Sequence, residues 1–158
     1  MFESEPVINV LWDAGADRTQ PLPFYASSGA AGADIRANFP PAQRNAGVVL
    51  GPGGRALLPT GLRLEIPMGF EVQIRPRSGL ALKHGITLLN APGTIDSDYR
   101  GPLGVILLNT SEVPFAVTHG SRIAQMIVAP VARARFLLAE VLGKSERGSG
   151  GFGSTGQG

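Results

Sequence analysis

The side chains best equipped for chemistry gather in residues 90–101, which read Asn-Ala-Pro-Gly-Thr-Ile-Asp-Ser-Asp-Tyr-Arg-Gly. Two carboxylates, a phenol and a guanidinium in so short a run supply hydrogen-bond acceptors and donors of several kinds. A turn needs one Asp or Gly and not this density of polar groups. We therefore predict a functional site here, in a hairpin between Ile95 and Leu103.

A second polar group comes just before a predicted short helix and reads Arg75-Pro76-Arg77-Ser78-Gly79. The first N–H groups of a helix have no partner inside it, and the helix dipole is positive at that end. Two flanking arginines would complete an anion site there. The residues alone fit a capped helix with solvated arginines equally well, so both interpretations stay open.

Two further polar islands lie inside strand-like runs. Asp34 stands within residues 31–37, where the residues alone favour an edge-strand carboxylate paired with Arg36. Arg122 and Gln125 are three apart on another predicted strand, which places them on opposite faces of a sheet. For either residue alone, a solvated outer face is the simpler interpretation.

The last island, residues 147–156, is rich in glycine and contains Ser, Thr and one aromatic residue, Phe152. Glycine allows the backbone to approach phosphate closely, hydroxyls add donors, and Phe152 offers one stacking face. A disordered tail without a role is the alternative. Because residues 143–158 contain seven glycines, we predict a mobile C-terminal tail or lid there, after one domain of residues 1–142.

Short strands must position these islands. Turn signals separate apolar or alternating segments every ten residues or so, a pattern typical of an all-β sandwich or barrel. Residues 78–85 are the exception, since Ser78 can cap a short helix, cations occupy its last turn and Gly85 can end it. The predicted strands are residues 7–11, 57–58, 62–66, 70–74, 105–108, 115–117, 122–128 and 136–138.

Composition narrows the function classes. The 22 glycines and 13 prolines in 158 residues exclude helical bundles and coiled coils. The net charge of +2 is too small to attract nucleic acid. The absence of Cys and the presence of only two His exclude disulfides, thiol catalysis and a His-built metal site. The N-terminus lacks the pattern of a signal peptide and no apolar run approaches a membrane span, so we expect a cytoplasmic protein without membrane contact.

Taken together, the five islands resemble the five ordered motifs of deoxyuridine triphosphatases (dUTP diphosphatases), from Ala31 to Gly156. The most specific matches are Arg77-Ser78-Gly79-Leu80-Ala81, residues 93–101 and residues 147–154. The resemblance implies a jelly-roll-like, all-β subunit of the β-clip type. It also implies a homotrimer with three active sites, each shared between subunits.

The reaction implied by the resemblance is dUTP + H2O → dUMP + pyrophosphate, with Mg2+ bound through the triphosphate. Such an enzyme keeps dUTP out of DNA and supplies dUMP for dTMP synthesis. Asp96 would be the base that deprotonates the attacking water. Asp34 would act on the waters of the metal or on an arginine and not on the metal directly.

The resemblance also implies the contacts to each part of the substrate. Tyr99 would pack against the sugar and exclude a 2′-hydroxyl, and Phe152 would stack on the base. The remaining binding residues are Arg77, Ser78, Gly79, Gln125, Arg147, Gly153, Ser154 and Thr155 for the phosphates, and Asn90, Gly93, Thr94, Ile95 and Gly104 for the uracil.

Two alternative functions belong to other classes. A dCTP deaminase, or a bifunctional deaminase-diphosphatase, needs a Glu on the strand after the predicted hairpin, and residues 103–109 contain none. A non-enzymatic trimeric module that binds nucleotides would gain nothing from a carboxylate at Asp96 facing a triphosphate. We therefore expect a dUTP diphosphatase.

Overall fold

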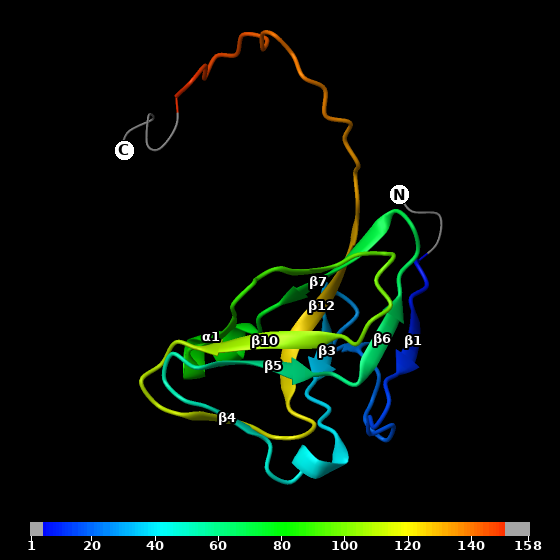
Figure 1. Cartoon of the computed structure of the whole chain (residues 1–158), viewed down its shortest axis with the longest axis vertical. Coiled ribbons are helices and arrows are strands. Elements are labelled where there is room, and N and C mark those ends of the chain that lie inside the picture. The colour runs from blue at the N-terminus through cyan, green and yellow to red at the C-terminus, as the bar shows by residue number, and fades with distance from the viewer. Residues whose placement is uncertain (1–4, 151–158) are drawn as a thin grey trace.

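Segments of alternating apolar and polar residues form short antiparallel strands throughout this chain (Figure 1). The computed structural model describes residues 5–150. The elements are β1 (Asn9–Trp12), β2 (Phe24–Tyr25), β3 (Ala33–Arg36), a 3-10 turn (Pro41–Gln43), β4 (Val48–Leu50), β5 (Arg55–Pro59), β6 (Leu62–Glu65), β7 (Phe70–Arg75), α1 (Ser78–His84), β8 (Ile86–Leu88), β9 (Gly93–Ile95), β10 (Gly104–Asn109), β11 (Phe115–Val117) and β12 (Arg122–Pro130).

The strands form four antiparallel sheets. The largest has the order β2-β3-β12-β7-β9, a second has the order β5-β10-β8, and the pairs β1-β6 and β11-β4 complete the set. The sheets do not close into a barrel within the described residues. The prediction of an all-β, jelly-roll-like fold with one short helix is therefore confirmed.

The core lies between the two larger sheets. Along β10 every second residue is buried, which points Val105 and Leu107 inward, and β7 contributes Val72 and Ile74 from the facing sheet. This period of two is the one that a half-buried strand requires. The apolar faces hold the sheets together, and the polar islands lie in loops and at strand ends except for Asp34 within β3 and Gln125 within β12.

The helix ends as the sequence predicts and begins differently. Gly85 takes the left-handed conformation with φ 64°, and its N–H donates to the carbonyl of Ala81. Ser78 is the first helical residue and not the N-cap, because Arg77 occupies that position without a side-chain capping bond. The Ser78 hydroxyl makes no hydrogen bond within residues 5–150 and therefore stays available to a ligand.

Two predictions of local structure are wrong. The predicted hairpin between Ile95 and Leu103 does not form, because β9 pairs with β7 whereas β10 pairs with β5 and β8. The intervening residues 96–103 are a loop that joins two different sheets. The predicted strand at residues 136–138 is also absent, since the chain runs away from the sheets after β12 and meets no neighbouring strand (Figure 1).

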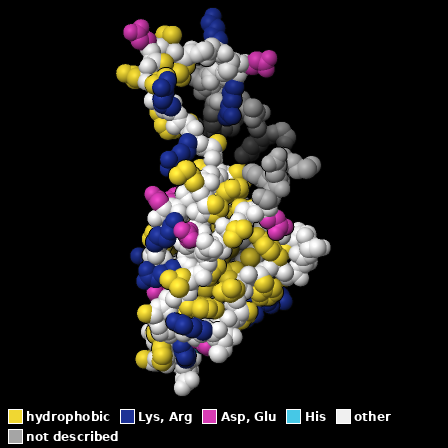
Figure 2. Space-filling view, turned by 90° about the vertical axis from the view of Figure 1, so that its right-hand side faces the viewer, with side chains coloured by type: hydrophobic (Ala, Val, Ile, Leu, Met, Phe, Trp, Pro, Cys, Tyr) yellow, Lys and Arg dark blue, Asp and Glu magenta, His cyan; other side chains and the backbone are white. Residues whose placement is uncertain are grey.

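The segment that leaves the sheets exposes large apolar side chains. Phe136 is 94% exposed and Leu138 is fully exposed. Figure 2 shows this segment standing off from the body of the protein, with open space between them. No helix among residues 5–150 is long and apolar enough to cross a membrane.

A half-buried histidine, His119, ties the N-terminal loop to the body. His119 Nδ1 accepts a hydrogen bond from the Phe39 N–H at 3.0 Å, so Nε2 carries the proton and donates to Asp17 Oδ2 at 3.1 Å. Hydrogen bonds from the Thr19 side chain and backbone, together with that from His119, lower the pKa of Asp17 to about 2. These contacts fix the loop that follows β1 and so fix the position of Asp13.

Candidate active site

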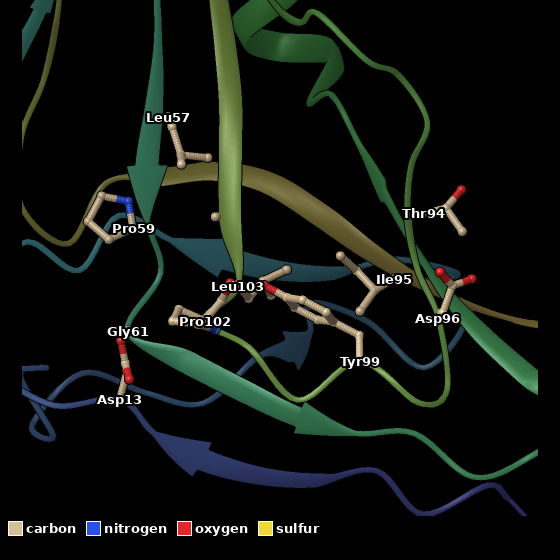
Figure 3. A pocket seen from close by; sticks show the side chains of 11 residues that line it. Asp13, Leu57, Pro59, Gly61, Thr94, Ile95, Asp96, Tyr99, Pro102 and Leu103 are labelled. Carbon is tan, nitrogen blue, oxygen red and sulfur yellow. Dashed lines mark hydrogen bonds between the residues drawn. The ribbon is translucent and has the colours of Figure 1, made fainter.

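The loop between β9 and β10 borders a cavity of about 390 Å³ (Figure 3). Five predicted substrate-site residues line it, namely Thr94, Ile95, Asp96, Tyr99 and Gly104. In Figure 3 the ring of Tyr99 lies across the middle of the view, with Asp96 on one side and Asp13 and Pro59 on the other. A cavity of this size accommodates a nucleoside-sized ligand.

Asp96 has a free carboxylate and lines the cavity. It is exposed, and within residues 5–150 no hydrogen bond or ion pair engages its side chain. Its carbonyl oxygen accepts the Tyr99 N–H at 3.1 Å, which closes a turn and holds the two residues together. A carboxylate that stands free at the rim of a cavity is able to accept a proton from a bound water.

Tyr99 is fixed by its own loop. Its hydroxyl donates to the carbonyl of Pro102 at 3.0 Å, so the ring folds back over Gly101. A Cβ atom on Gly101 would overlap the phenol oxygen and Cζ of Tyr99. Glycine is thus required at position 101 to let the ring lie in the cavity.

The sequence did not identify the residues that form the opposite wall of the cavity. Leu57 and Pro59 come from β5, Gly61 precedes β6, and Asp13 follows β1. Asp13 Oδ1 accepts a hydrogen bond from Arg63 Nε at 2.7 Å, which lowers the pKa of the Asp13 carboxyl below its usual value. Of these four residues, only Asp13 could have been recognised from the sequence, because it is an acid directly after a predicted strand.

A second polar cluster surrounds Asp34. Asp34 is buried, with 4% of its surface exposed. Arg77 Nε donates to Oδ1 at 3.2 Å, Gln125 Nε2 donates to Oδ1 at 3.3 Å, and Arg122 Nη1 donates to Oδ2 at 2.9 Å. The predicted pairing with Arg36 is wrong, because that guanidinium donates to the carbonyl of Gly120. The strand β3 that carries Asp34 also lies inside the sheet and not at its edge.

A β-bulge explains why Arg122 and Gln125 reach the same carboxylate. The pairing of β12 with β3 shifts between Arg122 and Ala124, so Ile123 and Ala124 are buried in succession. One extra residue reverses the alternation of side chains along the strand. The prediction that Arg122 and Gln125 face opposite sides is therefore wrong. The sequence also did not predict that Arg122 belongs to the Asp34 cluster.

The other predicted residues lie next to these two groups. Ser78 and Gly79 occupy the first turn of α1, after Arg77, and no bond inside residues 5–150 uses their N–H groups. Asn90 precedes β9, and its amide lies against Gly93. Neither Asn90 nor Gly93 lines the cavity in the single chain.

Arg147 lies away from both groups. It is exposed, and its Nε donates to the carbonyl of Gly150 at 2.7 Å. Phe152, Gly153, Ser154 and Thr155 lie outside the described residues.

The sheet register separates the two groups. Asp34, Gln125 and Arg75 stand in one row across β3, β12 and β7. Extending the register of β9 against β7 by one residue puts Asp96 beside Glu71. The two rows are four residue positions apart along β7, a spacing of about 13 Å. Asp96 and the Asp34 cluster therefore lie apart within one chain.

The comparisons with known proteins agree on one family. The dUTPase family model matches residues 18–156. The deoxyuridine 5'-triphosphate nucleotidohydrolase of Roseobacter denitrificans is 63% identical over 149 residues, which cover 94% of this chain and 95% of that protein. Its counterpart in Dinoroseobacter shibae is 57% identical and covers 96% of this chain and 98% of that protein.

A solved structure gives the same result for the fold. The dUTPase of Staphylococcus bacteriophage 80alpha with dUPNHPP superposes with a TM-score of 0.81 at 25% identity, covering 95% of this chain and 98% of that one. The family match spans both polar groups and the C-terminal island. On these grounds the chain belongs to the dUTPase family.

Proposed function

We propose that this protein hydrolyses dUTP to dUMP and pyrophosphate, which keeps dUTP out of DNA and supplies dUMP for dTMP synthesis. The observation that carries the proposal is the unengaged carboxylate of Asp96 at the rim of a cavity that Tyr99 crosses. Family membership gives the substrate, and the geometry gives a base and a pocket beside each other.

The cavity is suited to a uracil base. Leu57, Ile95 and Leu103 give it apolar walls, while the backbone at Thr94, Ile95 and Gly104 offers donors and acceptors to the base edge. Uracil presents acceptor, donor and acceptor along that edge, and the amino group of cytosine reverses one end. When cytosine occupies a site built for uracil, some hydrogen-bonding groups of the site stay unpaired. This lowers the rate with dCTP by several powers of ten relative to dUTP.

The chemical step is an attack of water on the α-phosphorus. Asp96 accepts one proton of the water while the water oxygen forms a bond to the α-phosphorus. The bond from the α-phosphorus to the oxygen that bridges to the β-phosphate breaks, and pyrophosphate leaves with that oxygen. Positioned donors on the phosphates lower the barrier, because negative charge shifts onto the leaving group.

The Asp34 cluster is suited to hold the phosphates. Arg77 presents a guanidinium, Ser78 an unused hydroxyl, and Gly79 an unused N–H. Gln125 adds an amide donor, and its side chain lies close to Gly32, where an added Cβ would come to 3.2 Å from Gln125 Cβ. We assign the closing contacts to Arg147, Gly153, Ser154 and Thr155, and the stacking on uracil to Phe152.

Mg2+ fits this site through the substrate. Within residues 5–150 no group of three or more His, Cys, Asp or Glu side chains is placed to hold a metal ion. Mg2+ is usually bound by substrate phosphates and a few carboxylates, and it keeps several waters. Among the described residues Asp34 Oδ2 accepts a bond from Arg122 alone, so it can accept another from a water of the ion. When bound, the ion neutralises charge on the triphosphate.

We further propose that copies of the chain assemble into a homotrimer in which each site is shared. The spacing between Asp96 and the Asp34 cluster supports this assignment, because the strand register holds the two groups apart in a single chain. An Asp96 carboxylate from one copy and the phosphate-binding cluster of another would complete a site. The exposed apolar residues after β12 offer surface for such contacts.

Mixing two inactive variants tests the shared site. We expect Asp96→Asn and Arg77→Gln each to lose most activity alone. When the two are unfolded and refolded together in equal amounts, about a quarter of the sites combine an intact Asp96 with an intact Arg77. Activity should return to that fraction of the parent. Mixing without refolding is the control, and an absence of recovery after refolding would contradict sharing.

Pyrophosphate release with dUTP, dCTP and UTP tests the proposed reaction. We expect dUMP and pyrophosphate from dUTP, and rates with dCTP lower by several powers of ten. Ammonia released from dCTP would favour a deaminase instead. Binding of dUTP without any product would favour a nucleotide-binding module, and either result would refute the proposal.

The sugar contact gives a prediction for Gly101. We expect Gly101→Ala to displace the Tyr99 ring and to lower the ratio of kcat/KM for dUTP to that for UTP, as Tyr99→Ala should. The expected fall is about tenfold or more, the cost of losing one well-packed contact. Gly29→Ala is the matched control, because a Cβ there meets nothing within 4 Å. An unchanged ratio in Gly101→Ala would clear Tyr99 of this role.

A further inference from the structure

Arg63 joins the two walls of the cavity from outside. Its Nε donates to Asp13 Oδ1 at 2.7 Å, and its Nη1 donates to the carbonyl of Arg100 at 3.2 Å. Asp13 lines one wall of the cavity, and Arg100 directly follows Tyr99 in the loop that forms the other wall. A single planar guanidinium thus sets the separation between those walls.

The strand β6 aims Arg63 at this position. Leu62 and Leu64 are buried, so Arg63 and Glu65 face away from the core. The β1–β6 pairing continues past Leu62, because the Asp13 N–H donates to the carbonyl of Gly61 at 2.7 Å. Arg63 pairs with Leu11, so Asp13 lies diagonally across from it, two residues further along the neighbouring strand. The carbonyl of Arg100 lies within reach of its other arm.

The loop keeps its own shape through a second arginine. Arg100 Nη1 donates to the carbonyls of Ser97 at 2.7 Å and Tyr99 at 3.0 Å. Its Nη2 lies 3.9 Å from Glu65, too far for a strong contact. These bonds fix the loop internally, so the Arg63 bond is the close side-chain contact between the middle of the loop and β6.

We infer that Arg63 is a positioning residue for sugar specificity, holding the loop that carries Asp96 and Tyr99 at a fixed distance from the Asp13 wall. The side chains of Arg63 and Asp13 are 39% and 25% exposed, so this link is partly screened by water. Its loss should let the loop move outward and widen the space beside Tyr99. The inference rests on the proposed dUTP hydrolysis, because the specificity ratio is its readout.

The test compares Arg63→Gln with the parent on dUTP and UTP. We expect the ratio of kcat/KM for dUTP to that for UTP to fall about three- to tenfold, as for loss of a partly exposed charged contact. The KM for dUTP should rise more than kcat falls. In Arg63→Lys this ratio should lie between those of Arg63→Gln and the parent. The lysine ammonium can still pair with Asp13, but it lacks the second, coplanar N–H group that binds the Arg100 carbonyl.

Arg55→Gln is the matched control, because Arg55 lies on β5 and its side chain makes no hydrogen bond within residues 5–150. The inference is wrong if the ratio of kcat/KM for dUTP to that for UTP is the same in Arg63→Gln as in this control. It is also wrong if Arg63→Gln lowers Tm and leaves that ratio unchanged. Should Arg63→Gln fail to fold, the ratio in Arg63→Lys decides in the same way. A parent protein that does not hydrolyse dUTP would refute the proposed function instead, which separates the two failures.

Discussion

Asp96→Asn should lower kcat for dUTP by about 10²- to 10⁴-fold, the usual contribution of a positioned general base. The amide keeps the size of the carboxylate but cannot accept the proton of the attacking water. Because Asp96 makes no side-chain contact within residues 5–150, its replacement should leave Tm unchanged. Affinity for the non-hydrolysable analogue dUpNHpp, measured by calorimetry, should stay close to that of the parent.

Asp98→Asn is the matched control for this result. Asp98 is two residues away, is equally exposed and free of partners in the described structure, and does not line the cavity. The two variants lose the same charge from the same loop, so a general electrostatic effect would lower both activities. Activity within a few-fold of the parent in Asp96→Asn would show that another group takes the proton.

Deletion of every residue after Lys144 should lower kcat/KM for dUTP by about 100-fold or more. The deletion removes Arg147, a cation for the phosphates, and Phe152, whose stacking on a base is worth roughly 1–3 kcal/mol. Within the described residues, 145–150 bond only to one another. Tm and the number of subunits in the assembly should therefore remain those of the full chain.

A shorter deletion controls for the loss of chain length. Removal of Gln157 and Gly158 leaves all of the C-terminal island and should preserve activity. Phe152→Ala should reproduce part of the loss seen in the long deletion. If the long deletion turns over dUTP normally, the C-terminal island has no role in the reaction.

The sequence predicted best what is local. Gly85 ends α1 because its left-handed conformation is encoded by a single residue, and the alternation in residues 62–66 and 70–74 follows from burial of one face. The segment around Asp96 and Tyr99 was found because its polar density exceeds what a turn needs. These features require no knowledge of distant contacts.

The sequence could not predict what depends on strand pairing. Ile123 and Ala124 are both apolar, so no change of pattern marks the bulge that turns Arg122 toward Asp34. Leu57 and Asp13 line the cavity because β5, β6 and β1 meet there, and such pairing between distant segments leaves no local signal. The sequence around Phe136 resembles a strand, but a strand needs a partner, and residues 5–150 offer none there.

The spacing between the Asp96 row and the Asp34 row affects how the activity should respond when the protein is diluted. Under the proposed assembly, a solitary chain holds two incomplete halves and binds dUTP with neither at full strength. The nucleotide is then a ligand of the associated form alone, and mass action makes it favour association. Specific activity becomes a property of protein concentration, falling when subunits are scarce and recovering when substrate is plentiful. Even a cell that needs little activity must therefore maintain a concentration of chains high enough for the subunits to stay associated.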